Sequence, residues 1–410
     1  MKLFTTYSLT LVIFVALLGG CTKEDGPCPS PAARTLLVYM GADNNLAGDA
    51  WSNIGDIAAG LRAAPDNTHT VVYLDTPQGN PRLLEVTADG AKEVYAWPEQ
   101  HNSASPEVMR GVIERVCRDY PAGRYGLVLW SHGMAWVPST ATDYFTRSRS
   151  RAGDGWPATK YFGQDDTPGP RGYLETEDLA AALPDGRFDY ILFDACFMAS
   201  VEVEYALRAK ADYIVAAPTE VISDGFPYGD IVGELLAAEP DLKAVCRTYY
   251  EHYAQHADAR YRSASVSLVR TSELEALCDL KARLWSSALE HDPAVFADFD
   301  LAGVQRLDRY RRPFLFDLGS IVSRLETMGA ISSAEGDAWR RQAARTVLYE
   351  AHTPFFFDLA IGECSGLSGY VPVAAYPDLN AYYRTLAWTV HDQQVDLSNT
   401  PPRNNCVLTR

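Results

Sequence analysis

Two chemically reactive side chains each follow a short apolar run that is typical of a buried strand. Cys196 comes soon after residues 188–193 (FDYILF), and His132 comes soon after residues 125–130 (YGLVLW). A thiol and an imidazole at neighbouring strand ends favour nucleophilic catalysis, because an imidazole can ionise the thiol or protonate a leaving amine. The backbone N–H groups of Gly133 and Cys196 are candidate donors to an oxyanion, since glycine permits close approach. The alternative is that Cys196 is a buried, unreactive residue and His132 an ordinary polar one.

The residues after Cys196 have the spacing of a helix. Val201 and Tyr205 fall at helical spacing, and Glu202 and Glu204 would then point away from the core. This pattern predicts that the strand runs directly into a helix, with Cys196 close to the helix N-terminus. That position favours the thiolate, and the carboxyl edge of an open α/β sheet is where such folds bind ligands.

Strands alternate with helices along the first part of the chain, which predicts an α/β fold with a mostly parallel sheet and helices on both faces. The predicted elements are strands at 34–40, 69–74, 125–130, 188–193 and 212–217, a hairpin at 83–95, and helices at 46–62, 105–118 and 175–183. The later part of the chain is more helical. We therefore predict a catalytic domain over residues 34–260 and a C-terminal subdomain over residues 261–410.

A long polar excursion over residues 134–172 separates the two reactive strand ends. Its first half carries alternating arginines, and its second half is rich in Gly, Pro and Asp. Loops of this length inside a compact domain are usually functional. We predict an exposed loop here.

The N-terminal segment has the pattern of an export signal. A short positive start and an apolar run too short to span a bilayer lead into Leu18-Gly19-Gly20-Cys21. This resembles a bacterial lipoprotein signal, which would make residues 1–20 a signal peptide, Cys21 the lipidated residue and residues 21–33 a linker. The expected location is the cell envelope, outside the cytoplasm, at the outer membrane or the cell surface. The alternative is an ordinary secretory signal.

The chain is acidic, with a formal net charge of −17; removing residues 1–20, whose only charge is Lys2, gives −18 (−17 − 1). This charge argues against nucleic acid as a partner and suits cationic substrates. Eight cysteines include no CxxC zinc pattern, so no metal site is expected. The sequence leaves disulfide pairing of Cys364 or Cys406 open.

Several motifs in this order resemble those of the clostripain family of cysteine peptidases, relatives of caspases, legumains and gingipains. The segments that carry the resemblance are Val38–Asn45, Leu129–Gly133, Gly163–Asp166, Phe193–Cys196 and Gly225–Tyr228, with a fainter one at Gly366–Pro372. The resemblance covers roughly residues 34–230. It implies a caspase-like sheet with a His-Gly after one strand and a Cys after the next.

The resemblance also implies roles for individual residues. Cys196 is the nucleophile, His132 protonates the leaving amine, and Gly133 contributes to the oxyanion site. Asp194 corresponds to the acidic residue of the pocket for the side chain before the cut bond, where a carboxylate would pair with Arg or Lys. Asp224 is a candidate second wall of that pocket. The alternatives are a helix cap or a hydrogen-bonded strand end for Asp194, and a turn residue for Asp224.

Members of this family often mature by cutting themselves, and the loop over residues 134–172 is the expected place. Its candidate cleavage sites are Arg147, Arg149, Arg151 and Lys160. The alternative is that these are solvated charges. No cofactor is expected. Some relatives respond to calcium, but Asp43, Asp165 and Asp166 do not have EF-hand spacing, so no calcium site is assigned.

Two functions follow from these patterns. The first is a monomeric, lipid-anchored thiol protease that cuts proteins or peptides after Arg or Lys, secreted as a zymogen and activated in the loop over residues 134–172. The second is a catalytically silent surface lipoprotein that binds basic peptides in the same cleft.

Overall fold

The computed structural model describes residues 31–141, 157–160, 174–296, 299–372 and 376–389. The chain divides into two units, residues 1–31 and residues 32–410, and every element below belongs to the second unit. The predicted signal peptide and most of the predicted linker lie outside the described residues.

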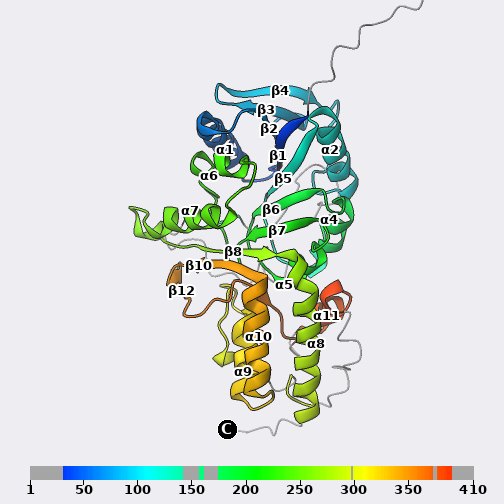
Figure 1. Cartoon of the computed structure of the whole chain (residues 1–410), viewed down its shortest axis with the longest axis vertical. Coiled ribbons are helices and arrows are strands. Elements are labelled where there is room, and N and C mark those ends of the chain that lie inside the picture. The colour runs from blue at the N-terminus through cyan, green and yellow to red at the C-terminus, as the bar shows by residue number, and fades with distance from the viewer. Residues whose placement is uncertain (1–30, 142–156, 161–173, 297–298, 373–375, 390–410) are drawn as a thin grey trace, which may run out of the picture. The chain divides into compact units, whose positions relative to one another are not determined.

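A nine-stranded sheet forms the centre of this unit, in the order β10-β8-β7-β6-β5-β1-β2-β3-β4 (Figure 1). Five central strands are parallel: β1 (Ala32–Gly41), β2 (Thr68–Asp75), β5 (Ala122–Trp130), β6 (Phe188–Asp194) and β7 (Ala211–Ala216). The edge strands are antiparallel: β3 (Arg82–Thr87), β4 (Gly90–Ala96), β8 (Ser265–Arg270) and β10 (Val347–His352). The predicted α/β fold with a mostly parallel sheet is confirmed.

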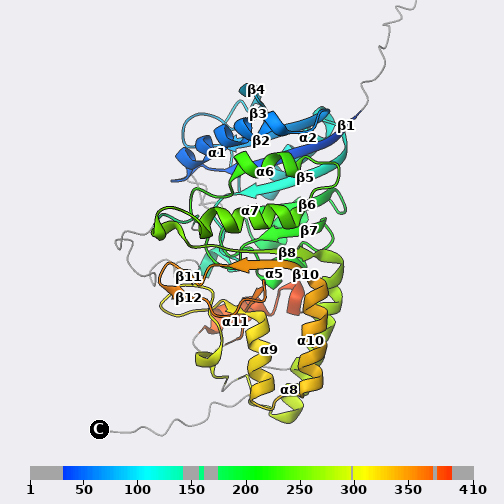
Figure 2. The ribbon, with the colours of Figure 1, turned by 60° about the vertical axis from the view of Figure 1, so that its left-hand side comes forward.

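Helices cover both faces of the sheet (Figure 2). One face carries α1 (Ala47–Gly60), α6 (Tyr228–Leu235) and α7 (Leu242–Ala254), and the other carries α2 (Pro106–Asp119), α4 (Thr176–Ala182) and α5 (Val201–Ala206). Along β6, Tyr190 and Leu192 belong to the core under α1, α6 and α7, whereas Ile191 and Phe193 belong to the opposite core. Because side chains alternate along a strand, Asp194 follows Leu192 onto the face of α1 and α6.

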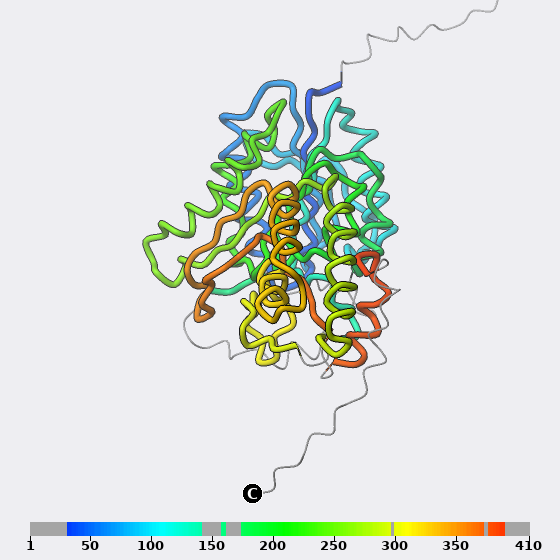
Figure 3. The backbone as a smooth tube through the Cα atoms, turned by 60° about the horizontal axis from the view of Figure 1, so that its bottom comes forward, coloured from blue at the N-terminus to red at the C-terminus, as the bar shows by residue number. Residues whose placement is uncertain are grey.

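The C-terminal part is more helical, as predicted, and its helices lie side by side (Figure 3). Its elements are α8 (Leu274–His291), β9 (Phe316–Asp317), α9 (Leu318–Thr327), α10 (Ser333–Thr346), β11 (Phe355–Phe356), β12 (Leu359–Ala360), β13 (Ser368–Gly369) and α11 (Pro377–Tyr383). Two strands from this part, β8 and β10, extend the sheet of the first part. Residues on both sides of the predicted boundary near 260 therefore build one sheet.

The chain after β6 differs from the predicted helix. β6 ends at Asp194, and α5 begins only at Val201. Phe197 has φ 64°, in the left-handed region that interrupts regular structure, and its N–H donates to the Thr219 carbonyl at 2.8 Å. The prediction of a helix N-terminus beside Cys196 is therefore wrong, because the loop after β6 forms hydrogen bonds with the loop after β7 and does not form a helix.

Two glutamates of α5 are buried, contrary to the expectation that they point outward. Glu202 accepts hydrogen bonds from Ser200 Oγ at 2.5 Å and from the Tyr370 N–H at 3.1 Å. Within the described parts of the chain, neither carboxyl oxygen of Glu204 has a hydrogen-bond partner. Burial raises the pKa of both carboxyls, that of Glu202 to about 7. The sequence pattern missed this because α8 and β13, distant in sequence, pack on α5.

We predict that Glu204→Met stabilises the protein more at pH 8 than at pH 5. Because burial raises its pKa, this carboxyl holds its proton more tightly in the folded state than in the unfolded chain, where it ionises near the ordinary value of 4.5. Wild-type stability therefore falls as pH rises above that value. Removing the unpartnered group should raise the free energy of unfolding at pH 8 by about 1–3 kcal/mol. Urea unfolding at both pH values measures this, with the exposed Glu114→Met as control. Equal effects of both substitutions at both pH values would contradict the prediction.

Candidate active site

The two reactive strand ends meet at one edge of the sheet. Trp130, the last residue of β5, is in register with Asp194, the last residue of β6. His132 and Cys196 therefore leave the sheet together, as predicted. The main chain of Gly133 packs against that of Cys196: a Cβ at position 133 would overlap the Cys196 carbonyl oxygen. Only glycine fits there, and its close approach places the two candidate oxyanion donors on adjacent segments.

The orientation of His132 is fixed by Asn45, which follows β1. His132 is buried, and its Nε2 lies 3.0 Å from Asn45 Oδ1. Because an amide oxygen only accepts, the contact places a proton on Nε2, which leaves Nδ1 as the basic atom of the neutral ring. Asn45 belongs to the segment Val38–Asn45 that carries the family resemblance, but its local sequence predicted no role for it.

The Cys196 thiol is buried against the loop that follows β7. The Val221 N–H donates to Cys196 Sγ at 3.1 Å, and Sγ lies 3.6 Å from the Val221 carbonyl oxygen. The side chain of Cys196 has no exposed surface. The nucleophile candidate is thus held under a strand-like segment, residues 221–223, and is closed to solvent in this state.

Asp194 forms the floor of a buried acidic pocket, and a lysine of the same chain fills it. Lys160 Nζ lies 2.6 Å from Asp194 Oδ2, and both side chains are fully buried. The Tyr228 hydroxyl donates to the same oxygen at 2.9 Å and the Phe226 N–H at 3.3 Å. Asp194 is therefore not a helix cap, since the next helix starts several residues later. It is a hydrogen-bonded strand end, as the alternative interpretation held, and its carboxylate faces this buried pocket.

The walls of this pocket fit a long cationic side chain. The Lys160 ammonium lies 4.3 Å from the centre of the Trp130 ring, a cation–π contact. Gly225, with φ +77°, passes so close that a Cβ there would overlap both the Asp194 carboxylate and the Lys160 ammonium. Burial lowers the pKa of Lys160, and the neighbouring Asp194 carboxylate opposes this shift. The pocket thus fits one long aliphatic side chain that ends in a positive charge.

Asp224 does not line the pocket floor in this structure. Asp224 is exposed, and its main-chain carbonyl accepts a hydrogen bond from Asn53 Nδ2 at 2.9 Å. Asp49 of α1 is the additional acid whose charge acts on Lys160. Burial raises the pKa of Asp49, Lys160 lowers it and Asp224 adds to the rise, so these groups share one electrostatic environment. Asp49 lies far from Asp194 in sequence, and nothing in its local pattern singled it out.

Residues 157–160 lie against the site as an extended strand. The Lys160 N–H donates to the Val221 carbonyl at 2.8 Å, and the Ser223 N–H donates to the Ala158 carbonyl at 2.9 Å. Between these bonds Thr159 pairs antiparallel with Ile222. Val221 thereby contacts both Lys160 and the Cys196 thiol. A short piece of the predicted loop is bound in the geometry of an added β-strand, with its lysine in the acidic pocket.

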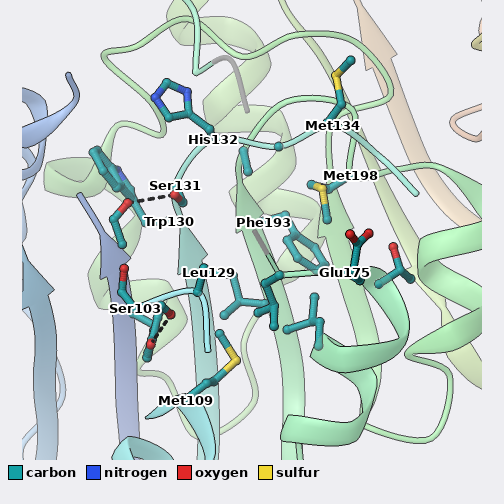
Figure 4. Close-up of a pocket in the computed structure, with 18 of the residues that line it drawn as sticks. Ser103, Met109, Leu129, Trp130, Ser131, His132, Met134, Glu175, Phe193 and Met198 are labelled. Atoms are coloured by element: carbon teal, nitrogen blue, oxygen red, sulfur yellow. Dashed lines mark hydrogen bonds between the residues drawn. The ribbon is translucent and has the colours of Figure 1, made fainter. Parts of the chain in front are cut away.

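An apolar cavity of about 120 Å³ lies on the other face of the sheet (Figure 4). His132 borders it, and Met109, Leu129, Phe193 and Met198 line it. The acidic pocket and this cavity thus flank the strand ends from opposite faces.

The remaining predicted site residues, Cys21, Arg147, Arg149 and Arg151, lie outside the described residues. Among the residues that the structure describes, no three His, Cys, Asp or Glu side chains are grouped to hold a metal ion, and no two cysteines form a disulfide. In the same residues, no helix has the length and apolar character needed to cross a bilayer.

Comparison with known proteins identifies the family to which the chain belongs. A family model described as the clostripain family matches residues 38–351. Clostripain from Hathewaya histolytica is 24% identical over 232 residues, which are 50% of this chain and 42% of clostripain. The chain therefore covers less than half the length of this curated relative.

Two crystal structures are similar over most of this chain. An inactive zymogen C11 protease from Parabacteroides distasonis is 30% identical, with a TM-score of 0.74 over 88% of this chain and 99% of that one. A secreted C11 cysteine protease from Bacteroides thetaiotaomicron, in complex with an irreversible peptide inhibitor, is 25% identical, with a TM-score of 0.71 and the same coverage. The expected caspase-like fold is confirmed by these likenesses.

We predict that Lys160→Ala exposes the Cys196 thiol. Without the lysine, a docked segment 157–160 would leave the Asp194 charge buried and unpaired, at a cost of about 3–5 kcal/mol, so the segment should leave. Alkylation of Cys196 by iodoacetamide should then accelerate about tenfold or more. Peptide mapping by mass spectrometry measures the rate, in a His132→Ala background so that the chain stays uncut.

Lys160→Arg is the matched control, because its guanidinium keeps the positive charge. Its alkylation rate should stay close to that of the parent. Equal rates for the alanine variant and the parent would contradict the assignment of Lys160 as the residue that closes the site.

Proposed function

Because the chain belongs to the clostripain family of cysteine peptidases, we propose that it is an endopeptidase that cuts after lysine or arginine. Cys196 is the nucleophile and His132 the acid–base residue of this proposal. The observation that carries it is the ion pair between Lys160 and Asp194, two residues before Cys196. The chain's own lysine occupies the position that a substrate's basic side chain would take.

The geometry supports a specific division of work among the site residues. Cys196 Sγ attacks the carbonyl carbon after the basic residue, and the thiol proton passes to His132 Nδ1. The N–H groups of Gly133 and Cys196 donate to the oxyanion that forms. When the C–N bond breaks, His132 returns the proton to the leaving amine, and water then hydrolyses the thioester to free acid and thiol. Asn45 is the positioning residue, because it holds Nε2 and so directs Nδ1.

The acidic pocket supports the choice of substrate. Asp194 is fully buried, and a buried carboxylate is stable only with a cation or donors beside it. Tyr228 and the Phe226 N–H supply two donors, which leaves the place taken by the Lys160 ammonium for a substrate cation. An acidic or apolar side chain would leave this charge uncompensated. Lysine and arginine are the side chains that can both reach the floor and neutralise it.

We also propose that this chain is made as a zymogen and activated by cutting after Lys160. Segment 157–160 is bound like a substrate: Lys160 fills the acidic pocket, and the segment pairs with residues 221–223, which cover the thiol. A free substrate cannot enter until the segment is released. Of the candidate self-cleavage sites, Lys160 alone lies within the described residues, and its contacts with Asp194 and Val221 support it. Arg147, Arg149 and Arg151 stay as predicted alternatives.

The remaining parts of the proposal come from the sequence. The Leu18–Cys21 signal supports export and lipid anchoring at the cell envelope, and the similar protease of Bacteroides thetaiotaomicron is described as secreted. The proposed substrates are proteins or peptides with a basic residue before the cut bond. No cofactor, no assigned calcium site and no nucleic acid enter the proposal, and the expected state is a monomer.

We predict that residues 22–410, once matured, hydrolyse fluorogenic peptides ending in Arg or Lys but not those ending in Asp or Leu. Cys196→Ala should abolish hydrolysis, and Asp194→Asn should lower kcat/KM about 10- to 100-fold by removing a charge-assisted contact. The exposed Asp66→Asn is the control and should behave as wild type. Hydrolysis after Asp or Leu would discard Asp194 as the specificity residue. No hydrolysis, even after trypsin treatment, would favour the silent binding protein.

We predict that maturation depends on Lys160 and not on the three arginines. The Lys160→Ala variant should stay a single chain on storage, because alanine cannot bind the acidic pocket, whereas its released segment should leave the site open to short peptides from the start. The triple variant Arg147→Ala, Arg149→Ala, Arg151→Ala should mature at the wild-type rate. Gel electrophoresis with parallel activity assays measures both. A triple variant that stays intact while Lys160→Ala matures would move activation to the arginines.

A further inference from the structure

A second side chain of the docked segment makes a specific buried contact. Thr159 Oγ1 donates to Glu220 Oε1 at 3.0 Å, and the two residues are 6% and 4% exposed. Thr159 immediately precedes the lysine in the acidic pocket. We propose that Glu220 is a specificity residue that selects a hydroxyl-bearing side chain, threonine or serine, at the substrate position before the basic residue. This inference rests on the proposed function.

The strand geometry of the segment explains why the substrate would follow the same path. Residues 158–160 are extended and hydrogen-bonded on one edge to residues 221–223. In an extended strand, successive side chains point to opposite sides. When Lys160 enters the acidic pocket, Thr159 must therefore turn toward Glu220. Any peptide that places its basic side chain on Asp194 and pairs with the same edge presents its preceding side chain to Glu220.

Glu220 is held ready as an ionised acceptor by Arg309. Arg309 Nε donates to Glu220 Oε2 at 2.6 Å, and its second nitrogen donates to Oε1 at 3.2 Å. The guanidinium itself rests over the Phe357 ring, 4.7 Å from its centre, and bonds Asp358 at 3.4 Å. This two-point contact fixes the plane of the carboxylate, so Oε1 faces Thr159 in a set direction. Such an acceptor favours a hydroxyl donor over an aliphatic group of the same shape.

The contact also gives the C-terminal part of the chain a role in recognition. Arg309 lies between α8 and β9, whereas Glu220 follows β7 of the first part. A loop more than eighty residues away thus sets the position of the residue that contacts the substrate. An acidic substrate side chain before the basic residue would lie next to the Glu220 carboxylate, and the two negative charges would repel each other. Aspartate and glutamate should therefore be disfavoured at this position.

The test compares quenched fluorescent peptides that differ in one residue. The matured full chain is given Ala-Thr-Lys and Ala-Val-Lys peptides, because valine matches threonine in shape but lacks the hydroxyl. A peptide with Ser tests the hydroxyl without the methyl group. We expect kcat/KM to be about 10- to 100-fold higher for the threonine peptide, since a lost bond to a buried charged group has this effect.

Variants of the enzyme then assign the preference to Glu220. Glu220→Gln should reduce the threonine-to-valine ratio to about threefold or less, because a neutral amide can form only a weaker, uncharged hydrogen bond with the hydroxyl. The ratio is internal to each variant, so a general loss of stability does not change it. The exposed Asp230→Asn is the matched control and should keep the wild-type ratio.

The outcomes are distinguishable. A wild-type ratio near one, with normal cleavage after lysine, would overturn the inference about Glu220 and leave the proposed peptidase intact. An unchanged ratio in Glu220→Gln would overturn it as well, because the preference would then come from another residue. Failure of wild type to cut every lysine and arginine peptide would overturn the proposed function, and the inference with it.

Discussion

A buried ion pair between Lys160 and Asp194 joins the strand that leads to Cys196 with segment 157–160, which pairs with the residues that cover the thiol. Two fully buried charges at 2.6 Å are stable only when the remaining lone pairs and the walls fit closely. Here Tyr228 and the Phe226 N–H both donate to Oδ2 of the carboxylate, and the Trp130 ring faces the ammonium. Removing the lysine without a replacement would leave an uncompensated charge. The same interaction thus accounts for the closed state and supports the proposed preference for a basic side chain in the substrate.

The parallel sheet is what brings these groups together. β5 and β6 end in register, so His132 and Cys196 leave the sheet side by side, and alternation along β6 turns Asp194 to the face covered by α1 and α6. The loop after β7 contacts both the thiol and the docked segment. Val221 forms hydrogen bonds with the Cys196 thiol and with the Lys160 main chain, and Glu220 accepts a hydrogen bond from Thr159. Nucleophile, acidic pocket and strand-binding edge therefore depend on three neighbouring strand ends of one sheet.

Local patterns predicted the parts of this arrangement that local physics determines. The apolar runs that lead to His132 and Cys196 follow from strand periodicity, and they form β5 and β6 where expected. The helix expected directly after Cys196 was wrong, because Phe197 adopts a left-handed conformation that spacing cannot reveal. Local patterns also could not predict contacts between distant segments, such as those of Asn45 with His132, of Lys160 with Asp194 and of Arg309 with Glu220. Each pairs residues from different loops, and no periodicity links them.

Hydrogen exchange at two backbone amides tests most directly whether segment 157–160 occupies the substrate site until it is cut. The Lys160 and Ser223 N–H groups donate across the pairing of this segment with residues 221–223. In the uncut Cys196→Ala chain both amides should exchange slowly, and in the self-matured wild-type chain both should exchange much faster, because the segment has left. Equal exchange before and after maturation would contradict the account, since the segment would then not be what blocks the site.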